Sequence, residues 1–261
     1  MTSPLPIRTG ENKMDTNRRI AIVAGVMFII ATVGALASSA LLAPILSAPD
    51  YLARISANEG QVLWGACLQL IAGLACPAIA LALYPVLRKH GEGLALGSVG
   101  FRLIEGALYV VLVVVLLLLV TLSRETAKAG VAAGSASQVP GALLMASRDW
   151  LGPVAGVVTF GLGAFMYYVV LYRSRLIPRW LSGWGIVGVT LVIVSGLLVM
   201  FGLAAPLSTP QVILALPIAV QEMVLAVWLI ARGFDPAAMA AESGSEMPRR
   251  QTAAPSPIPA T

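Results

Sequence analysis

Two ionisable residues, Arg102 and Glu105, lie inside an apolar run at residues 94–122 that otherwise consists mostly of Leu and Val. Ser98 and Tyr109 flank them, and the spacings of four, three and four residues place all four side chains on one face of a helix. Charged groups in hydrocarbon are costly, so those that occur there pair with one another or line a hydrated path. This polar face is therefore expected to point into a helix bundle, away from lipid.

Another acidic residue, Glu222, follows Gln221 near the middle of the apolar run 212–230. If both runs cross a membrane, Glu222 and Glu105 lie at similar depths, roughly 12 to 17 Å from the cytoplasmic ends at about 1.5 Å per residue. The two carboxylates are then expected to face one another across the core of the bundle.

The predicted cluster therefore combines Arg102 with the carboxylates of Glu105 and Glu222. Its charge is minus one when all three groups are ionised, and burial disfavours this surplus, so a bound proton or cation would neutralise it. Gln69, between Gly65 and Gly73, offers an amide to the same cavity. The candidate ligand- or proton-binding residues are Arg102, Glu105, Glu222, Gln221, Gln69 and Tyr109.

A structural interpretation of the same residues stays open. Arg102 could extend to the cytoplasmic interface, and Glu105 could pair with it at i, i+3 only to hold helix packing. No cofactor and no metal are predicted, because His90 is a single histidine in a basic loop, and Cys67 and Cys76 form no metal or redox motif. Phosphate-binding G-x-x-x-x-G-K-[ST] and H-E-x-x-H motifs are absent, which argues against an enzyme.

The composition identifies the solvent that must surround these residues. The chain is 58% hydrophobic and 11% charged, with a mean hydropathy of +0.89, which is too apolar for a soluble domain of 261 residues. Six apolar runs are each close to the roughly 20 residues that cross a bilayer. We predict an all-α integral membrane bundle at 20–232, between disordered cytoplasmic tails at 1–19 and 233–261. The expected transmembrane helices are 20–42, 62–84, 94–122, 151–172, 181–203 and 212–230.

Charge counting gives the expected orientation. Twelve of the seventeen Lys and Arg residues fall on the side of the N-terminus and four on the other, with Arg102 inside a run. Basic residues mark the cytoplasmic side, so both termini are expected in the cytoplasm. The basic residues behind the net charge of +5 are thereby interpreted as the residues that set the orientation of the chain in the membrane. No nucleic-acid partner is predicted.

Three stretches of the sequence are similar to a known family. LYPVLRKHGEGLALGSVGFRLIEGALYVV, RSRLIPRWLSGWGIVG and QEMVLAVWLIARGF resemble the bacterial membrane family catalogued as domain of unknown function 4386, and the resemblance runs from about Arg19 to Phe234. It implies a six-helix, multi-pass protein of the bacterial inner membrane. It implies no activity and no catalytic residues.

Three functions follow as hypotheses. The first is a small transporter or permease-like protein whose cluster binds a proton or a small polar solute. The second is a non-catalytic membrane partner that assembles with another protein or with copies of itself, and the third is an intramembrane enzyme. The lipid bilayer is the expected surrounding partner in each case.

Overall fold

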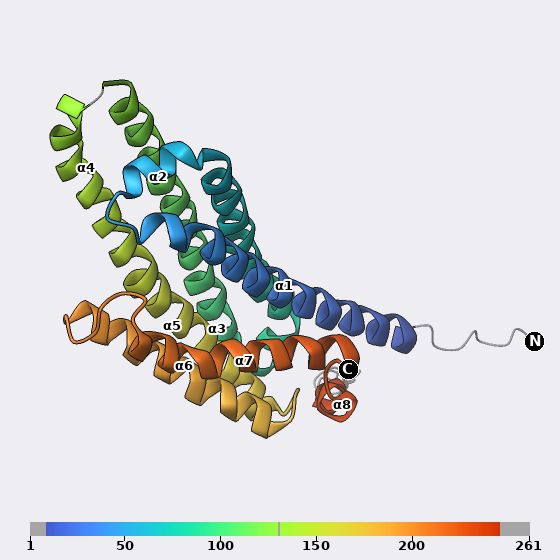
Figure 1. The fold of residues 1–261 in the computed structure, drawn as a ribbon. Helices are drawn as coiled ribbons and strands as arrows, with labels where there is room; N and C mark the ends of the chain where they lie inside the picture. The colour runs from blue at the N-terminus through green and yellow to red at the C-terminus, as the bar shows by residue number, and fades with distance from the viewer. Residues whose placement is uncertain (1–8, 130, 246–261) are drawn as a thin grey trace, which may run out of the picture.

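The computed structural model describes residues 9–129 and 131–245, and all elements in these two ranges are helical (Figure 1). This agrees with the predicted all-α class. The elements in chain order are α1 (Thr9–Leu46), α2 (Tyr51–Ala57), α3 (Glu59–Ala129), α4 (Val131–Trp150), the π-helix η1 (Leu151–Gly156), α5 (Val157–Ser174), α6 (Arg179–Met200), α7 (Thr209–Ala231) and α8 (Pro236–Ser245).

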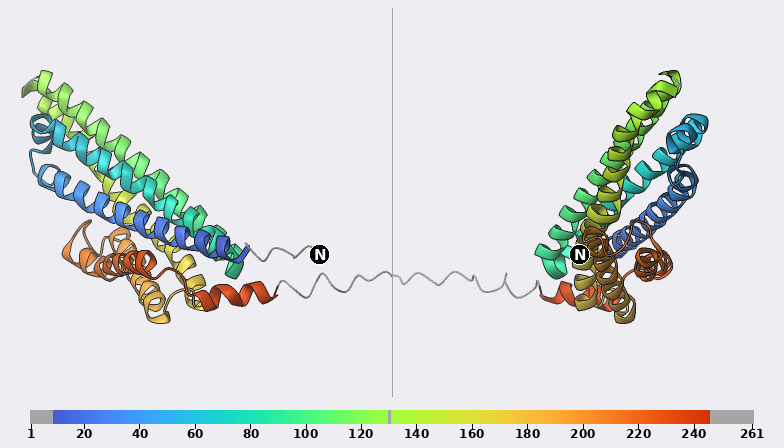
Figure 2. Two further views of the ribbon diagram at one scale, coloured as in Figure 1. Left: turned by 90° about the vertical axis from the view of Figure 1, so that its right-hand side faces the viewer. Right: turned by 60° about the vertical axis from the view of Figure 1, so that its left-hand side comes forward.

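The longest element, α3, is a hairpin of two helical arms that meet at Gly91. The backbone of Gly91 has φ 174° and ψ 81°, which is not helical, and the two arms on either side of it lie side by side (Figures 1 and 2). An ion pair between Glu59 and Arg124 joins their far ends. The first arm contains the predicted run 62–84, and the second contains the predicted run 94–122.

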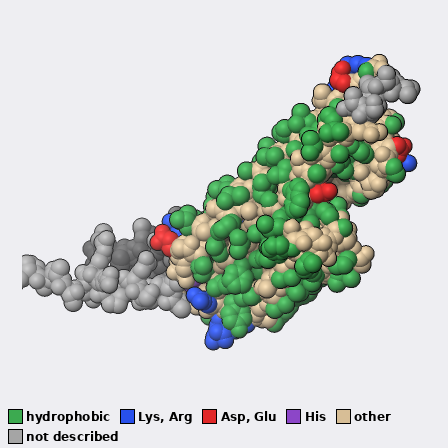
Figure 3. All heavy atoms as spheres, turned by 90° about the vertical axis from the view of Figure 1, so that its left-hand side faces the viewer, with side chains coloured by type: hydrophobic (Ala, Val, Ile, Leu, Met, Phe, Trp, Pro, Cys, Tyr) green, Lys and Arg blue, Asp and Glu red, His purple; other side chains and the backbone are tan. Residues whose placement is uncertain are grey.

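Five helical stretches are long and apolar enough to cross a membrane, namely Thr16–Leu46, Glu59–Ala129, Ser137–Ser174, Arg179–Met200 and Thr209–Ala231. The chain is thus a membrane protein with several apolar helices. The second stretch is the two-armed α3, which holds two of the six predicted runs. Apolar side chains cover most of the face in Figure 3, as expected of a surface in contact with lipid.

The helices α4, η1 and α5 follow one another without a break, so the predicted run 151–172 is only the second half of a longer rod. Pro153 explains the π-helix within it, because proline has no backbone N–H to donate and crowds the preceding turn. The carbonyl of Pro153 accepts a hydrogen bond from Nε2 of Gln211 on α7, at 3.1 Å. The irregular turn is in this way fixed to a neighbouring helix.

Two apolar cores hold the helices together. The larger core joins α1, both arms of α3, α5, α6 and α7, and contains Phe28, Tyr167 and Leu225. The smaller core lies at the end of the molecule that carries α2 and α4, and is built around Ile55 and Leu116 (Figure 1). The candidates Glu222 and Gln221 contact two tyrosines of the larger core, Tyr167 and Tyr168.

The ends of the chain differ in part from the expected tails. Residues 9–19 belong to α1, and residues 236–245 form α8, so both stretches are helical. Residues 233–235 form a short non-helical link before α8, and the rest of the predicted tails, residues 1–8 and 246–261, lies outside the described residues. At the start of α2, Arg54 donates a hydrogen bond to the N-cap residue Asp50 at 2.9 Å, and this contact holds the pKa of the Asp50 carboxyl below its ordinary value.

Candidate functional site

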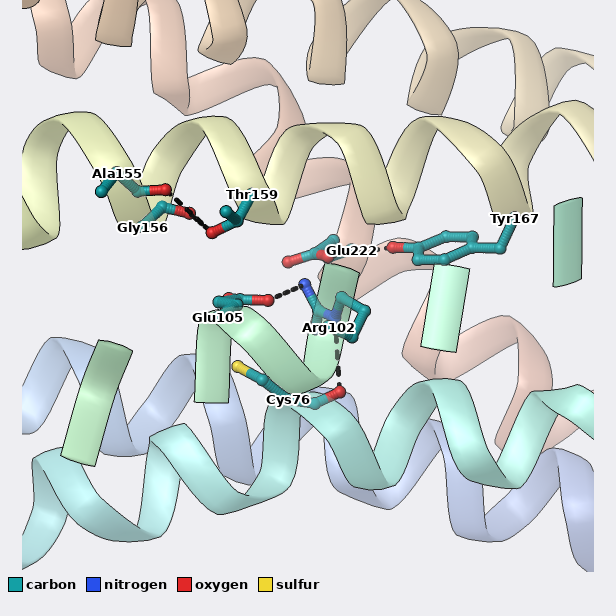
Figure 4. A network of polar contacts seen from close by, with 8 residues as sticks. All are labelled: Cys76, Arg102, Glu105, Ala155, Gly156, Thr159, Tyr167 and Glu222. Atoms are coloured by element: carbon teal, nitrogen blue, oxygen red, sulfur yellow. Dashed lines mark hydrogen bonds and ion pairs between the residues drawn. The ribbon is translucent and has the colours of Figure 1, made fainter. Parts of the chain in front are cut away.

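Arg102 and Glu105 form an ion pair inside the protein (Figure 4). Nη1 of Arg102 lies 3.0 Å from Oε2 of Glu105, one helical turn further along the second arm of α3. Arg102 is 1% exposed and Glu105 is 3% exposed, so both charges are removed from solvent and from lipid. Nε of Arg102 also donates a hydrogen bond to the carbonyl oxygen of Cys76 on the first arm, at 3.3 Å. Arg102 therefore does not extend to an interface, as one part of the structural interpretation allowed.

Helix α5 covers Arg102 from the other side. The ring of Phe160 lies under the guanidinium, with 5.1 Å between the guanidinium carbon and the ring centroid, a distance at which a cation and an aromatic ring attract. One turn further along, Gly163 makes room for the arginine stem, because a Cβ there would come within 3.1 Å of Cγ of Arg102. A larger residue at 163 would therefore have to displace the stem of Arg102 by a few tenths of an ångström.

Glu222 on α7 belongs to the same cluster. Its carboxylate faces the guanidinium of Arg102, and its Oε1 accepts a hydrogen bond from the hydroxyl of Tyr167 at 3.3 Å (Figure 4). Glu222 is half-buried, in contrast to the fully buried Glu105. The structure therefore brings together Arg102, Glu105 and Glu222, the three charged residues that the sequence predicts as a cluster.

Gln221 has a different role from its neighbour Glu222. Its Oε1 accepts a hydrogen bond from the hydroxyl of Tyr168 on α5, and its Nε2 donates to the carbonyl of Leu181 on α6, at 3.0 Å. These contacts satisfy both ends of the amide within the protein core. Gln221 therefore ties three helices together and does not face the cluster.

The other two candidates lie nearby without joining the cluster. Tyr109 packs against Gly73 across the α3 hairpin. Oε1 of Gln69 is buried and has no hydrogen-bond partner among the described residues. No hydrogen bond or ion pair within the described part of the chain connects Tyr109 or Gln69 with Arg102.

Ser98 extends the polar face toward the hairpin turn. It lies one turn before Arg102, is 2% exposed, and its hydroxyl has no hydrogen-bond partner among the described residues. A buried hydroxyl without a partner is energetically unfavourable. The second arm of α3 thus presents a buried donor group next to the ion pair.

Sequence reasoning missed Tyr167, Phe160 and the backbone of Cys76. Tyr167 and Tyr168 are adjacent tyrosines inside an apolar run, and a buried tyrosine hydroxyl requires a partner, so this pair was a usable signal. The carbonyl of Cys76 carried no such signal, because every residue offers a carbonyl. No group of three or more His, Cys, Asp or Glu side chains in the described residues could hold a metal ion.

Comparison with known proteins agrees with the resemblance in the sequence. A family model described as "Domain of unknown function (DUF4386)" matches residues 23–233, which is most of the chain. No curated protein and no solved structure matches the chain.

Proposed function

The chain belongs to the domain of unknown function 4386 family, whose description assigns no activity, and we propose from its buried cluster that it is a small transporter-like membrane protein. In this proposal a proton or a small cation occupies the space between Arg102, Glu105 and Glu222 during transport. The observation behind this proposal is that the apolar bundle contains one carboxylate more than it has positive charges to neutralise.

The charge balance of the cluster supports this function. Arg102 is committed to Glu105 by the close ion pair, so one positive charge meets two carboxylates. The one hydrogen bond of the Glu222 side chain in the described structure comes from Tyr167, at 3.3 Å, which is long for a hydroxyl donor. Glu222 is therefore the carboxylate best suited to gain and lose a proton or a cation.

The half-buried position of Glu222 and the unpartnered hydroxyl of Ser98 also favour transport. A group that exchanges a proton must be reachable, and Glu222 is more exposed than Glu105. Ser98 offers a polar group one turn from Arg102 on the side of the hairpin turn. Intramembrane polar groups of this kind usually mark the path of an ion or a solute.

The proposal includes a topology. The two arms of α3 count as separate crossings, which gives six crossings within residues 20–232, and the cytoplasmic tails 1–19 and 233–261 flank this domain. Both termini lie in the cytoplasm of a bacterium, and the membrane is the inner membrane.

Cysteine labelling tests this topology. In a Cys67→Ala/Cys76→Ala background, Lys128→Cys should react with an impermeant maleimide in intact cells, and Glu92→Cys should react only after permeabilisation. Labelling of both positions from the same side would contradict this orientation.

Flux in liposomes tests the transport function. Purified wild type should dissipate a pH gradient, and Glu222→Gln and Arg102→Met should slow this flux at least about tenfold, because each removes a charge from the proposed path. Glu92→Gln is the matched control, since Glu92 is an exposed carboxylate near the turn of the α3 hairpin. If liposomes with wild type lose the pH gradient no faster than protein-free liposomes and pass no small cation, the transport function is wrong. If Glu222→Gln folds and transports at the wild-type rate, Glu222 is not part of the path.

A non-catalytic partner function remains the second candidate. It is favoured by the contacts of Gln221 and Arg102, which link neighbouring helices and would also serve a purely structural core. In that case a second protein, or a second copy of this chain, should co-purify in fixed stoichiometry. The variants Glu222→Gln and Arg102→Met would then change assembly without changing any flux.

A further inference from the structure

A basic pocket lies at the end of the molecule where α5 turns into α6 and α7 leads into α8. The turn at residues 175–179 forms one wall, and residues 232–236 with Trp228 form the other. Both segments lie at the same end of the ribbon in Figure 1. The cavity between them measures about 610 Å³, within the size range of small-molecule sites.

Three arginines, Arg175, Arg179 and Arg232, line this pocket together with a single carboxylate, Asp235. Oδ1 of Asp235 accepts a hydrogen bond from the backbone N–H of Ala237 at 2.8 Å and so serves the start of α8. None of the three arginines forms an ion pair with a carboxylate within the described part of the chain. The pocket therefore holds a surplus of positive charge that the protein itself does not neutralise.

The wall that carries Arg175 and Arg179 is fixed by the fold. The backbone N–H of Asp235 donates to the carbonyl of Leu176 at 2.9 Å, and this bond closes the pocket across its two walls. Leu176 is fully buried, and Arg175 beside it adopts a left-handed backbone with φ 57°, which is uncommon outside glycine. The guanidinium of Arg179 lies over the ring of Tyr172, 5.4 Å from its centroid. The backbone of Arg175 and the side chain of Arg179 are thus held in place before any ligand binds.

Aromatic residues indicate that this pocket lies at the level of the lipid headgroups. Trp180 and Trp228 meet edge to face, with 6.5 Å between ring centroids, and Trp228 also lines the pocket. Tryptophan is enriched where hydrocarbon meets water. A cavity at that depth opens onto the headgroups of the surrounding lipid.

We propose that this pocket binds the phosphate of an anionic headgroup, such as that of phosphatidylglycerol, with Arg179 and Arg232 as its principal partners. Guanidinium groups match the geometry of phosphate oxygens and can donate two parallel hydrogen bonds. Basic pockets between membrane helices on the cytoplasmic side recognise anionic lipids in this way. The site is separate from the buried cluster of Arg102, so it stands whether or not the chain transports a proton.

Native mass spectrometry of the purified full chain tests the proposal. Wild type should retain phosphatidylglycerol more strongly than phosphatidylcholine with the same acyl chains. Arg179→Gln/Arg232→Gln should weaken retention of phosphatidylglycerol by at least about tenfold, since it removes both guanidinium groups that donate hydrogen bonds to the phosphate in the pocket. Arg88→Gln/Arg173→Gln is the matched control, because it removes two exposed arginines from the same end without altering the pocket. It should change retention by less than about twofold.

Competition with inorganic phosphate identifies the source of the phosphate. If phosphate displaces phosphatidylglycerol from wild type, the site recognises the phosphate group alone. If it does not, the glycerol and acyl chains contribute, and the lipid is the ligand. Either result supports the site when the arginine dependence holds. Equal retention of the two lipids, or equal weakening by the pocket variant and the control, would overturn the proposal, provided that both variants keep the wild-type melting temperature.

Discussion

Nε of Arg102 donates a hydrogen bond to the carbonyl oxygen of Cys76, which lies 26 residues earlier in the chain. This bond joins the two arms of the α3 hairpin at the level of the ion pair with Glu105. The arginine therefore serves both as the positive charge of the cluster and as a link between helices. Variants at this position must be interpreted with both roles in mind.

The ion pair between Arg102 and Glu105 should be strongly coupled. Glu105→Gln leaves a buried guanidinium without its nearest counter-ion and should lower the free energy of unfolding by roughly 3 kcal/mol or more. Arg102→Met/Glu105→Gln removes both charges and should be more stable than either single variant. Unfolding in detergent measures all three.

The exposed pair Glu125 and Lys128 is the matched control, since it has the same i, i+3 spacing but is mostly in contact with solvent. Glu125→Gln should cost less than about 1 kcal/mol. If the losses from the two buried single variants simply add in the double variant, the buried pair is not coupled.

Close contact between the arms of α3 should make Gly106 sensitive to substitution. A Cβ at Gly106 would lie 3.1 Å from the carbonyl oxygen of Gly73 and from the ring of Pro77. Gly106→Ala should therefore separate the arms and lower the melting temperature, with a cost of about 1–3 kcal/mol. Gly100→Ala, in the same helix but with no atom within 4 Å of its added Cβ, should be neutral or slightly stabilising. Equal effects of both variants would show that the arms are not in close contact.

Arg18 should stabilise the C-terminal end of α7. Its guanidinium donates hydrogen bonds to the carbonyls of Leu229 at 3.1 Å and Ile230 at 2.5 Å in the last turn of the helix. The carbonyl of Leu229 also accepts a hydrogen bond from the backbone N–H of Gly233, at 3.1 Å. Arg18→Gln should cost about 1–2 kcal/mol, because both the bonds and the favourable charge at the helix terminus are lost. Arg19→Gln, at the adjacent exposed arginine, should have little effect on the melting temperature. A similar loss in both variants would indicate a general effect of charge.

Substitutions at the adjacent residues Tyr167 and Tyr168 should distinguish an effect on transport from an effect on stability. The hydroxyl of Tyr167 contacts Glu222 of the proposed path, whereas that of Tyr168 contacts Gln221 of the structural core. Tyr167→Phe should change the rate of proton flux per folded molecule severalfold, because Glu222 loses its hydrogen-bond donor. Tyr168→Phe should lower stability by about 1–3 kcal/mol and leave that rate unchanged. If Tyr167→Phe transports protons like wild type, the hydroxyl plays no part in the path.

The polar face of the second arm was predictable because helical periodicity alone places Arg102 and Glu105 on one side of an apolar run. The depth of Glu222 in its own run was likewise a matter of counting residues. The contact of Tyr167 with Glu222 was not predictable, because it joins residues 55 positions apart and depends on how α5 packs against α7.

The sequence by itself determined that these residues require a bilayer. Runs of about 20 apolar side chains are long enough to cross the hydrocarbon core, and the few polar residues of this chain cannot shield that much apolar surface from water. It also determined that a charge within such a run must be sheltered from lipid. The tertiary structure alone decided which groups shelter it. The carbonyl of Cys76, the ring of Phe160 and the space at Gly163 reach Arg102 only after the hairpin closes at Gly91 and α5 packs against it. Such partners are set by the three-dimensional packing of helices, which a local pattern of residues does not encode.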